Sequence, residues 1–244
     1  LAGGLEIWSG NIKYAWSITF FILAGLFLAF SLYHKYILPA PGSDKSVVGQ
    51  NNASSILEGF IETFASFFRK KQAGVAILFM LFYRFPEAQL VKLINPFLLD
   101  PIEKGGLGLT TAEVGLVYGT IGIIGLTLGG IIGGICAAKG GLQKWLWPMA
   151  LIISLPNIAF VYLASVQPES FWVINLCVFI EQFGYGFGFT AYMLYMIYFS
   201  DGEHKTAHYA ICTAFMALGM MLPGMAAGWL QEQLGYENFF IWVM

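Results

Sequence analysis

The chain has 244 residues, of which 58% are hydrophobic and only 11% are charged, with a formal net charge of −2. Ordinary soluble domains carry about 25% charged residues, so this chain could not cover a water-facing surface, and a membrane protein is expected. The near-neutral charge also argues against a nucleic-acid partner. Three cysteines lie in apolar runs without the spacing of a metal site or disulfide framework, and they are interpreted as small buried hydrophobic residues: Cys136, Cys177 and Cys212.

The apolar segments are long enough to cross a bilayer as helices, which takes about 20 residues each. The first is Tyr14–Tyr33, and others are expected at about 73–99, 112–137, 145–165, 171–199 and 208–230. Because the apolar runs do not alternate as membrane strands do, an all-α, multi-pass membrane helical bundle is predicted. The last residues resemble the start of a further apolar span, and the chain begins at Leu1, so we expect a fragment of a longer protein.

A polar linker is predicted between the first two spans, at 39–53, because this stretch is rich in proline, glycine and asparagine. After it, apolar residues recur at helical spacing from Ile56 to Phe68, and Ser55 and Glu58 have the spacing of a capping box. This pattern predicts an amphipathic helix that either lies on the membrane surface or packs on the bundle, two alternatives that the sequence leaves open.

Lysine and arginine predict the orientation, because they concentrate in cytoplasmic loops. If the linker is cytoplasmic, the inner side holds most of the basic residues. These are Lys35, Lys45, Arg69, Lys70, Lys71, Lys139, Lys144 and Lys205 inside, against Lys13 and Lys104 outside.

The two ends of the chain resemble each other. AGGLEIWSGNIKY begins at Ala2 and AGWLQEQLGYENF begins at Ala227, and the alanine, glycine, leucine and a later glycine match in place. One such period contains six spans, which is the architecture of the major facilitator superfamily with its two six-helix halves. On this reading the chain holds helix 6, the central loop, helices 7 to 11 and the start of helix 12. The predicted domains are 1–38 (the last helix of the first half), 39–72 (the cytoplasmic linker) and 73–244 (the second half, truncated in its last helix).

Glycines at four-residue spacing predict close packing between helices, because small residues let backbones approach each other in lipid. They occur in the spans 112–137 and 208–230, as Gly115 and Gly119, Gly125, Gly129 and Gly133, and Gly224 and Gly228.

The span 73–99 carries charges that a bilayer disfavours by about 2.5–3.5 kcal/mol each at its centre. On a continuous helix, Arg84, Glu87, Lys92 and Asn95 share one polar arc, and Pro86 predicts a kink. One hypothesis is that the arc lines a transport pathway and binds substrate. The alternative is that Arg84 and Glu87 neutralise each other as an i, i+3 pair, while Lys92 and Asn95 reach toward the headgroups.

A second candidate site lies in the span 171–199. Glu181 and Gln182 are followed by glycines and by Tyr185 and Tyr192, so we expect a membrane carboxylate that exchanges a proton beside side chains that contact substrate. Glu87 is the other candidate for proton coupling. Glu181 could instead form a fixed pair with Arg84 or Lys92.

His204 and His208 have a spacing that could suit a metal, but no third ligand is evident, and we expect a solvated turn. No phosphate-binding loop or nucleophile triad is present in the sequence. No metal, cofactor or enzymatic activity is predicted.

Together these residues resemble the muropeptide permease branch of the major facilitator superfamily, which is related to acetyl-coenzyme A transporters. The resemblance is carried by four motifs: Tyr83, Arg84 and Glu87; the EVG of Glu113–Gly115; Glu181, Gln182, Gly186, Gly188, Ala191 and Tyr192; and TAHYA at Thr206–Ala210, where the family more often has glutamine at His208. The resemblance implies proton-coupled import of cell-wall sugar-peptides by alternating access across a bacterial inner membrane.

The predicted partners are accordingly a small-molecule substrate, a proton and the lipid bilayer, and a monomer is expected. Two other classes stay open: a transporter of another small organic solute (a sugar, nucleoside or acyl-coenzyme A compound), and a sensor with a transporter fold that moves nothing.

Overall fold

The computed structural model describes residues 1–39 and 53–244, with side chains described from residue 57 in the second range. Most of the predicted linker 39–53, Lys45 and the side chains of Ser55 and Ile56 therefore lie outside the described residues. The described residues form helices and short connections without any strand, which confirms the all-α bundle. The helices are α1 (Ala2–Ser9), α2 (Ile12–Ile37), α3 (Ala53–Arg69), α4 (Ala73–Phe82), α5 (Phe85–Leu99), η1 (Ile102–Lys104), α6 (Thr111–Leu116), η2 (Val117–Gly122), α7 (Ile123–Gly140), α8 (Leu142–Ser154), η3 (Leu155–Asn157), α9 (Ile158–Val166), α10 (Phe171–Phe199) and α11 (Lys205–Val243).

Five helical segments of the described residues are long and apolar enough to cross a membrane. They are Ile12–Ile37, Ala73–Leu99, Thr111–Gly140, Leu142–Val166 and Lys205–Val243, and they coincide with five of the six predicted spans. The sixth, α10, is 29 residues long, but its glutamate, glutamine, glycines and tyrosines lower its hydropathy. The second candidate site therefore lies in α10, the one predicted span that is not apolar enough to be counted among the five membrane-crossing segments.

The chain divides into two compact units, Leu1–Glu62 and Thr63–Met244. In the first unit, α1 ends at Gly10 in the left-handed conformation, with φ 63°, and Asn11 then caps α2 by accepting a hydrogen bond from the Tyr14 amide at 3.2 Å. The division at 38/39 and 72/73 made from the sequence stays a prediction.

The predicted kink at Pro86 takes the form of a complete break between α4 and α5. Arg84 has φ −110° and ψ 16°, outside helical geometry, and Pro86 lies in the first turn of α5. Proline has no amide hydrogen and its ring clashes with the carbonyl four residues earlier, here that of Phe82, so the helix ends just before it. The proline therefore acts upstream of its own position.

A second break lies within α11, at Gly235, whose φ is 74° and ψ 168°. The helix that began at Lys205 ends there and a short one follows, as predicted from the apolar C-terminal residues. Gly235 is the counterpart of Gly10 in the repeat between the two ends, and both glycines have positive φ at a break between helices. The repeat therefore places a glycine with positive φ at both breaks, although ψ differs between them, at 9° for Gly10 and 168° for Gly235.

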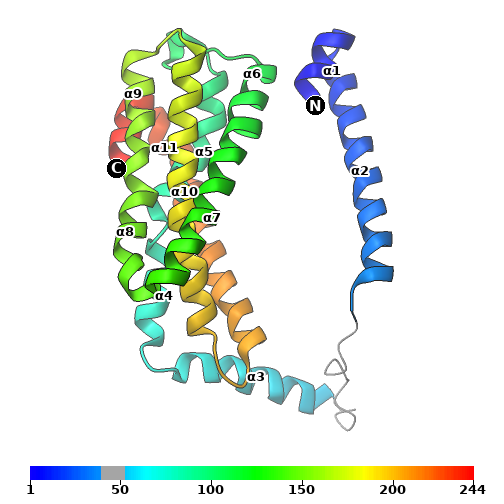
Figure 1. Ribbon diagram of the computed structural model, residues 1–244, viewed down its shortest axis with the longest axis vertical. Helices are drawn as coiled ribbons and strands as arrows, with labels where there is room; N and C mark the ends of the chain where they lie inside the picture. The colour runs from blue at the N-terminus through cyan, green and yellow to red at the C-terminus, as the bar shows by residue number, and fades with distance from the viewer. Residues whose placement is uncertain (40–52) are drawn as a thin grey trace. The chain divides into compact units, whose positions relative to one another are not determined.

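Glycines let α10 pack closely between α7 and α8, as Figure 1 shows. A Cβ at Gly125, Gly129 or Gly133 of α7 would overlap backbone atoms of α10, and one at Gly186 of α10 would overlap the Leu126 carbonyl of α7. On its other side, α10 presents Gly184 and Gly188 to the backbone of the α8–η3 segment. Close packing is thus confirmed for these glycines. It is wrong for Gly115, Gly119 and Gly228, where an added Cβ would have no atom within 4 Å.

The other side of the larger unit is formed by α11, which packs along α4 and α5. Its buried aromatic residues, Phe239 and Phe240, join an apolar core with Leu90, Phe97 and Phe160. Phe97 contacts Phe240 edge to face, with ring centroids 4.9 Å apart. This core fixes α5 and thereby the charged residues at its N-terminus.

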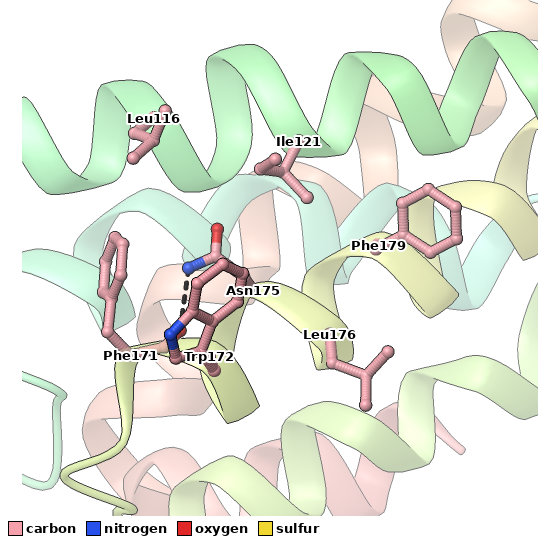
Figure 2. A pocket seen from close by; sticks show the side chains of 7 residues that line it. All are labelled: Leu116, Ile121, Phe171, Trp172, Asn175, Leu176 and Phe179. Carbon is pink, nitrogen blue, oxygen red and sulfur yellow. Dashed lines mark hydrogen bonds between the residues drawn. The ribbon is translucent and has the colours of Figure 1, made fainter.

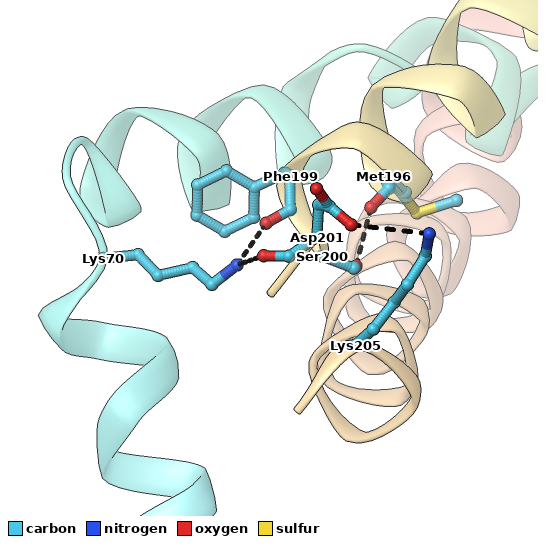
Figure 3. A network of polar contacts seen from close by, with 6 residues as sticks. All are labelled: Lys70, Met196, Phe199, Ser200, Asp201 and Lys205. Atoms are coloured by element: carbon cyan, nitrogen blue, oxygen red, sulfur yellow. Dashed lines mark hydrogen bonds and ion pairs between the residues drawn. The ribbon is translucent and has the colours of Figure 1, made fainter. Parts of the chain in front are cut away.

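The C-terminal part of α3 packs on the end of the bundle where α10 turns into α11 (Figures 1 and 3). Phe67 is fully buried, which stabilises the contact by roughly 2 kcal/mol. Lys70 Nζ donates to the carbonyl oxygens of Phe199 at 2.7 Å and Asp201 at 2.6 Å. Of the two alternatives for this helix, packing on the bundle is therefore realised for residues 63–69.

The prediction that His208 lies in a solvated turn is wrong. Its side chain is 4% exposed, and its Nε2 is hydrogen-bonded to Ser66 Oγ of α3 at 2.8 Å. The docked α3 covers the first turn of α11, and the sequence could not show this contact between residues so far apart. His204 is half-buried beside it, and the described residues contain no cluster of histidine, cysteine and carboxylate that could hold a metal.

Candidate functional site

Arg84 is the centre of the candidate site. It lies at the break between α4 and α5 and is 5% exposed. Its guanidinium donates a hydrogen bond to the Tyr185 hydroxyl, and its Cζ lies 5.1 Å from the ring centroid of Tyr185 and 4.6 Å from that of Phe189. Its Nε has no hydrogen-bond partner among the described residues. Two aromatic rings of α10 thus make cation–π contacts with the buried guanidinium, while its Nε edge has no hydrogen-bond partner among the described residues.

Glu87 lies one turn further along α5 and is 2% exposed. Neither of its carboxylate oxygens has a hydrogen-bond partner among the residues that the structure describes. The predicted ion pair between Glu87 and Arg84 is not formed, and the one salt bridge found in the described ranges joins Lys205 and Asp201, at 3.5 Å. The prediction assumed a continuous helix, but Arg84 lies outside helical geometry, so the two groups interact electrostatically without reaching ion-pair distance.

Glu181 of α10 is the second buried carboxylate, with 0% exposure. Its Oε2 accepts a hydrogen bond from Gln182 Nε2 at 3.0 Å, whereas its Oε1 has no partner among the described residues. The predicted alternative of a fixed pair with Arg84 or Lys92 is therefore not formed. Glu181 lies near enough to Glu87 for the two carboxylates to interact electrostatically. The site thus combines two acids that share one buried environment.

Two tyrosines, Tyr83 and Tyr192, fasten α4 to α10 beside these charges. The Tyr83 hydroxyl donates to the Gly188 carbonyl at 2.9 Å, and the fully buried Tyr192 hydroxyl donates to the Met80 carbonyl at 2.8 Å. The Tyr83 and Tyr192 rings stack with centroids 5.3 Å apart. Tyr192, predicted to contact substrate, is thus engaged in holding the two helices together, while Tyr185 lies directly on Arg84.

The two remaining predicted residues of α5, Lys92 and Asn95, lie outside this cluster. Lys92 and Asn95 are exposed on the surface of the unit, and a Cβ on Gly224 of α11 would lie 3.1 Å from Lys92 Cε. Gln89 is buried, but its Oε1 accepts a hydrogen bond from Trp242 Nε1 at 3.1 Å. The break displaces only Arg84 from the predicted arc, because Glu87, Lys92 and Asn95 all lie on α5.

Tyr118 is a residue of the site that sequence reasoning missed. It lies in η2, a π-helical turn, close to Glu87, Glu181 and Gln182. Insertions of this kind in a helix are frequent at functional sites, and here the extra residue displaces the helix next to α10, where a Cβ on Gly122 would lie 3.3 Å from Gln182 Cγ. Nothing in the sequence signals a π turn, because its pattern of apolar residues is that of an ordinary span.

Several hollows are lined partly by α10, of which two lie nearest its start. One, of about 410 Å³, is bordered by Tyr185, Phe189 and Thr190 and by Leu126 and Gly130 of α7. Tyr185 and Phe189, whose rings contact Arg84, therefore also line this hollow.

The other hollow, of about 380 Å³, lies near the start of α10 and is shown in Figure 2. Its lining is apolar except for Asn175, whose Nδ2 donates to the Phe171 carbonyl at 2.7 Å. Neither hollow is lined by a charged side chain, but the first is bordered by Tyr185 and Phe189, whose rings contact Arg84.

No family model matches the chain, but curated proteins do. The chain is 27% identical to the putative transporter AmpG 4 of Rickettsia felis over 94% of its length, 22% identical to the anhydromuropeptide permease of Escherichia coli K12 over 99%, and 27% identical to the putative transporter AmpG 2 of Rickettsia typhi over 75%. These matches cover 53%, 47% and 43% of the three relatives, so the chain spans about half the length of the curated relatives that it matches. The predicted resemblance is confirmed: the chain is a homologue of transporters named AmpG and of the anhydromuropeptide permease.

Proposed function

We propose that the chain forms part of a secondary active transporter that imports cell-wall muropeptides by alternating access, with a proton as the coupling ion, in a bacterial inner membrane. The observation that carries this proposal is the buried cluster of Arg84, Glu87 and Glu181, in which cation and acids are near one another yet unpaired. Burying unpaired charges costs several kcal/mol, so a cluster that served stability alone would have its members paired. Unpaired charges are instead available to a substrate and a proton.

The chemistry of the cluster suits a ligand with both sugar and carboxylate groups. The free Nε edge of Arg84 can donate to a carboxylate while Tyr185 holds the opposite side of the guanidinium. The rings of Tyr185 and Phe189 also line the hollow of about 410 Å³, and aromatic rings pack on the apolar side of a sugar. Gln182 adds an amide to the same site, while Lys92 and Asn95 remain candidates for contacts in a different part of the pathway.

A proton is the coupling ion that the two acids support. Glu87 and Glu181 are both buried and interact electrostatically, and carboxylates within membrane helices often serve in proton relays. A carboxylate of the substrate that binds Arg84 would change the field at Glu87, which gives a physical route from substrate binding to proton uptake or release.

The test is uptake of a labelled anhydromuropeptide by the complete protein in proteoliposomes with an imposed proton gradient. We expect Arg84→Gln to reduce both binding and uptake by at least ten-fold, because a charge-assisted hydrogen bond is lost. Glu87→Gln and Glu181→Gln should abolish gradient-driven accumulation while leaving downhill exchange measurable. Glu203→Gln, the same change at an exposed residue of the α10–α11 turn, should behave as wild type.

Three outcomes would contradict the proposal in different ways. Binding without uptake by the wild-type protein would favour a sensor. Uptake of another solute in preference to muropeptides would replace the substrate class. Wild-type accumulation in both glutamine variants would remove the proposed roles of Glu87 and Glu181.

A further inference from the structure

Asn157 is a buried polar residue that the proposed site does not yet use. It is the last residue of η3, the short turn between α8 and α9, and its side chain is 1% exposed. Neither its Oδ1 nor its Nδ2 has a hydrogen-bond partner among the described residues. An unpaired buried amide costs about 1–3 kcal/mol, and in native proteins such groups nearly always have a partner, which is often a buried water.

The packing register between α10 and the α8–α9 segment places Asn157 level with Glu181. Along α10, Gly188 packs against Met149 and Ile153, and one turn on, Gly184 packs against Ile152 and Pro156. The two segments are antiparallel, so a further turn toward the start of α10 brings Glu181 to the level of Asn157. Glu181 also lies on the same face of α10 as these two glycines, because residues three and seven apart share a helix face.

The neighbouring turn of the same contact offers a third polar atom. Pro156 has no amide hydrogen, so the Ile152 carbonyl lacks the donor that would follow it in a regular helix. This carbonyl oxygen lies at the α8–α10 contact, beside Gly184. An unpaired carboxylate oxygen, an unpaired amide and a carbonyl without its helical donor therefore lie within about one turn of each other by this register, and a buried water typically has about three polar partners.

We propose that Asn157 is a positioning residue for Glu181, joined to it by a water molecule held in this region. The inference rests on the proposed role of Glu181, because it describes how the second acid of the site is held. The water would give the Glu181 Oε1 a hydrogen-bond partner on the α9 side, while Gln182 holds Oε2 on the other. The orientation of the carboxyl group would then depend on a residue of a different helix.

The test does not require transport. The shift in melting temperature caused by Glu181→Gln is measured on the purified complete protein in detergent, in four backgrounds: wild type, Asn157→Leu, Asn157→Ser and Asn175→Leu. Leucine fills the space of asparagine without its polar atoms, and serine keeps a hydroxyl that can hold the water. Asn175 is the matched control, because it is also a buried asparagine with an unpaired Oδ1 but lines the apolar hollow.

We expect Asn157→Leu to lower the melting temperature and to change the shift caused by Glu181→Gln, whereas Asn157→Ser and Asn175→Leu leave that shift as it is in wild type. Non-additivity of this kind arises between residues that share an interaction. The same shift in all four backgrounds would overturn the inference, and so would a rise in melting temperature in Asn157→Leu, because an amide without any partner is improved by replacement with an apolar group. If Asn157→Leu is not recovered folded, Asn157→Ala takes its place. A protein that fails to transport muropeptides but shows this coupling would refute the proposed function alone.

Discussion

Replacing Gly129 with alanine should separate α7 from α10. A Cβ at this position would overlap the Phe183 carbonyl and lie 2.9 Å from the Phe187 amide nitrogen, where an ordinary van der Waals contact begins at about 3.4 Å. These are backbone atoms, which cannot rotate out of the way as a side chain does. The helices must therefore move apart by at least about half an ångström at the closest point of the contact.

The cost follows from this displacement. Inserting a methyl group into a closely packed contact costs about 1–3 kcal/mol, and the upper part of that range applies because the obstacle is backbone. At about 2–4 °C per kcal/mol, the melting temperature should fall by roughly 5–10 °C. The assay is thermal unfolding of the complete protein in detergent at one fixed scan rate, followed by circular dichroism.

Gly134→Ala is the control, because Gly134 lies in the same helix and a Cβ there would have no atom within 4 Å. It should melt at or slightly above the wild-type temperature, since alanine favours a helix over glycine by about 0.5–1 kcal/mol. Equal melting temperatures for Gly129→Ala and Gly134→Ala would refute the reasoning that the α7–α10 contact is limited by backbone approach.

Two further substitutions test other contacts of α10. Lys70→Met should expose the C-terminal part of α3, because it removes the two hydrogen bonds to the carbonyls of Phe199 and Asp201; at about 1 kcal/mol after solvent screening, amide hydrogen exchange over residues 63–69 should rise about five-fold. Tyr192→Phe should cost about 1–2 kcal/mol through the lost bond to the Met80 carbonyl, seen as a lower melting temperature.

An unchanged exchange rate in Lys70→Met would show that the buried aromatic contacts of α3 hold this segment on the bundle without the hydrogen bonds of the lysine. For the second substitution, the informative control is substrate affinity. If Tyr192→Phe weakens muropeptide binding without lowering the melting temperature, its hydroxyl contacts substrate as the sequence predicts, and the helix-fastening role assigned from the structure is wrong.

The sequence predicts the spans well because each is a long apolar run. In lipid the backbone N–H and C=O groups must form hydrogen bonds within the segment, and a helix achieves this. It also draws attention to the three charges at the site, since Arg84, Glu87 and Glu181 are conspicuous in apolar surroundings. What it does not predict is their pairing. The i, i+3 rule applied to Arg84 and Glu87 assumed one helix, and Pro86 breaks that helix upstream of its own position.

Asn157 and His208 show a second limit. Each is a single polar residue whose importance comes from what packs against it from another helix, and neither has a periodic partner in its own segment. The repeat between the chain ends marks the opposite case. The matching glycines of the two ends are recognised from the sequence, but no backbone conformation is predicted from them. Gly10 and Gly235 nevertheless both have positive φ where one helix ends and another begins.

The glycine faces of α10 have a mechanical consequence. The backbone of α10 is in close contact with the backbones of α7 on one side and α8 on the other. Sliding or rotation of α10 would cause steric overlap, so the three helices form one rigid layer. Tyr185, Phe189 and Glu181 belong to α10 in this layer, whereas Arg84 lies at the break between α4 and α5 and Glu87 lies in the first turn of α5. The cation and its aromatic partners therefore come from different helices, and the place of the α4–α5 break determines how Arg84 meets the rings of Tyr185 and Phe189.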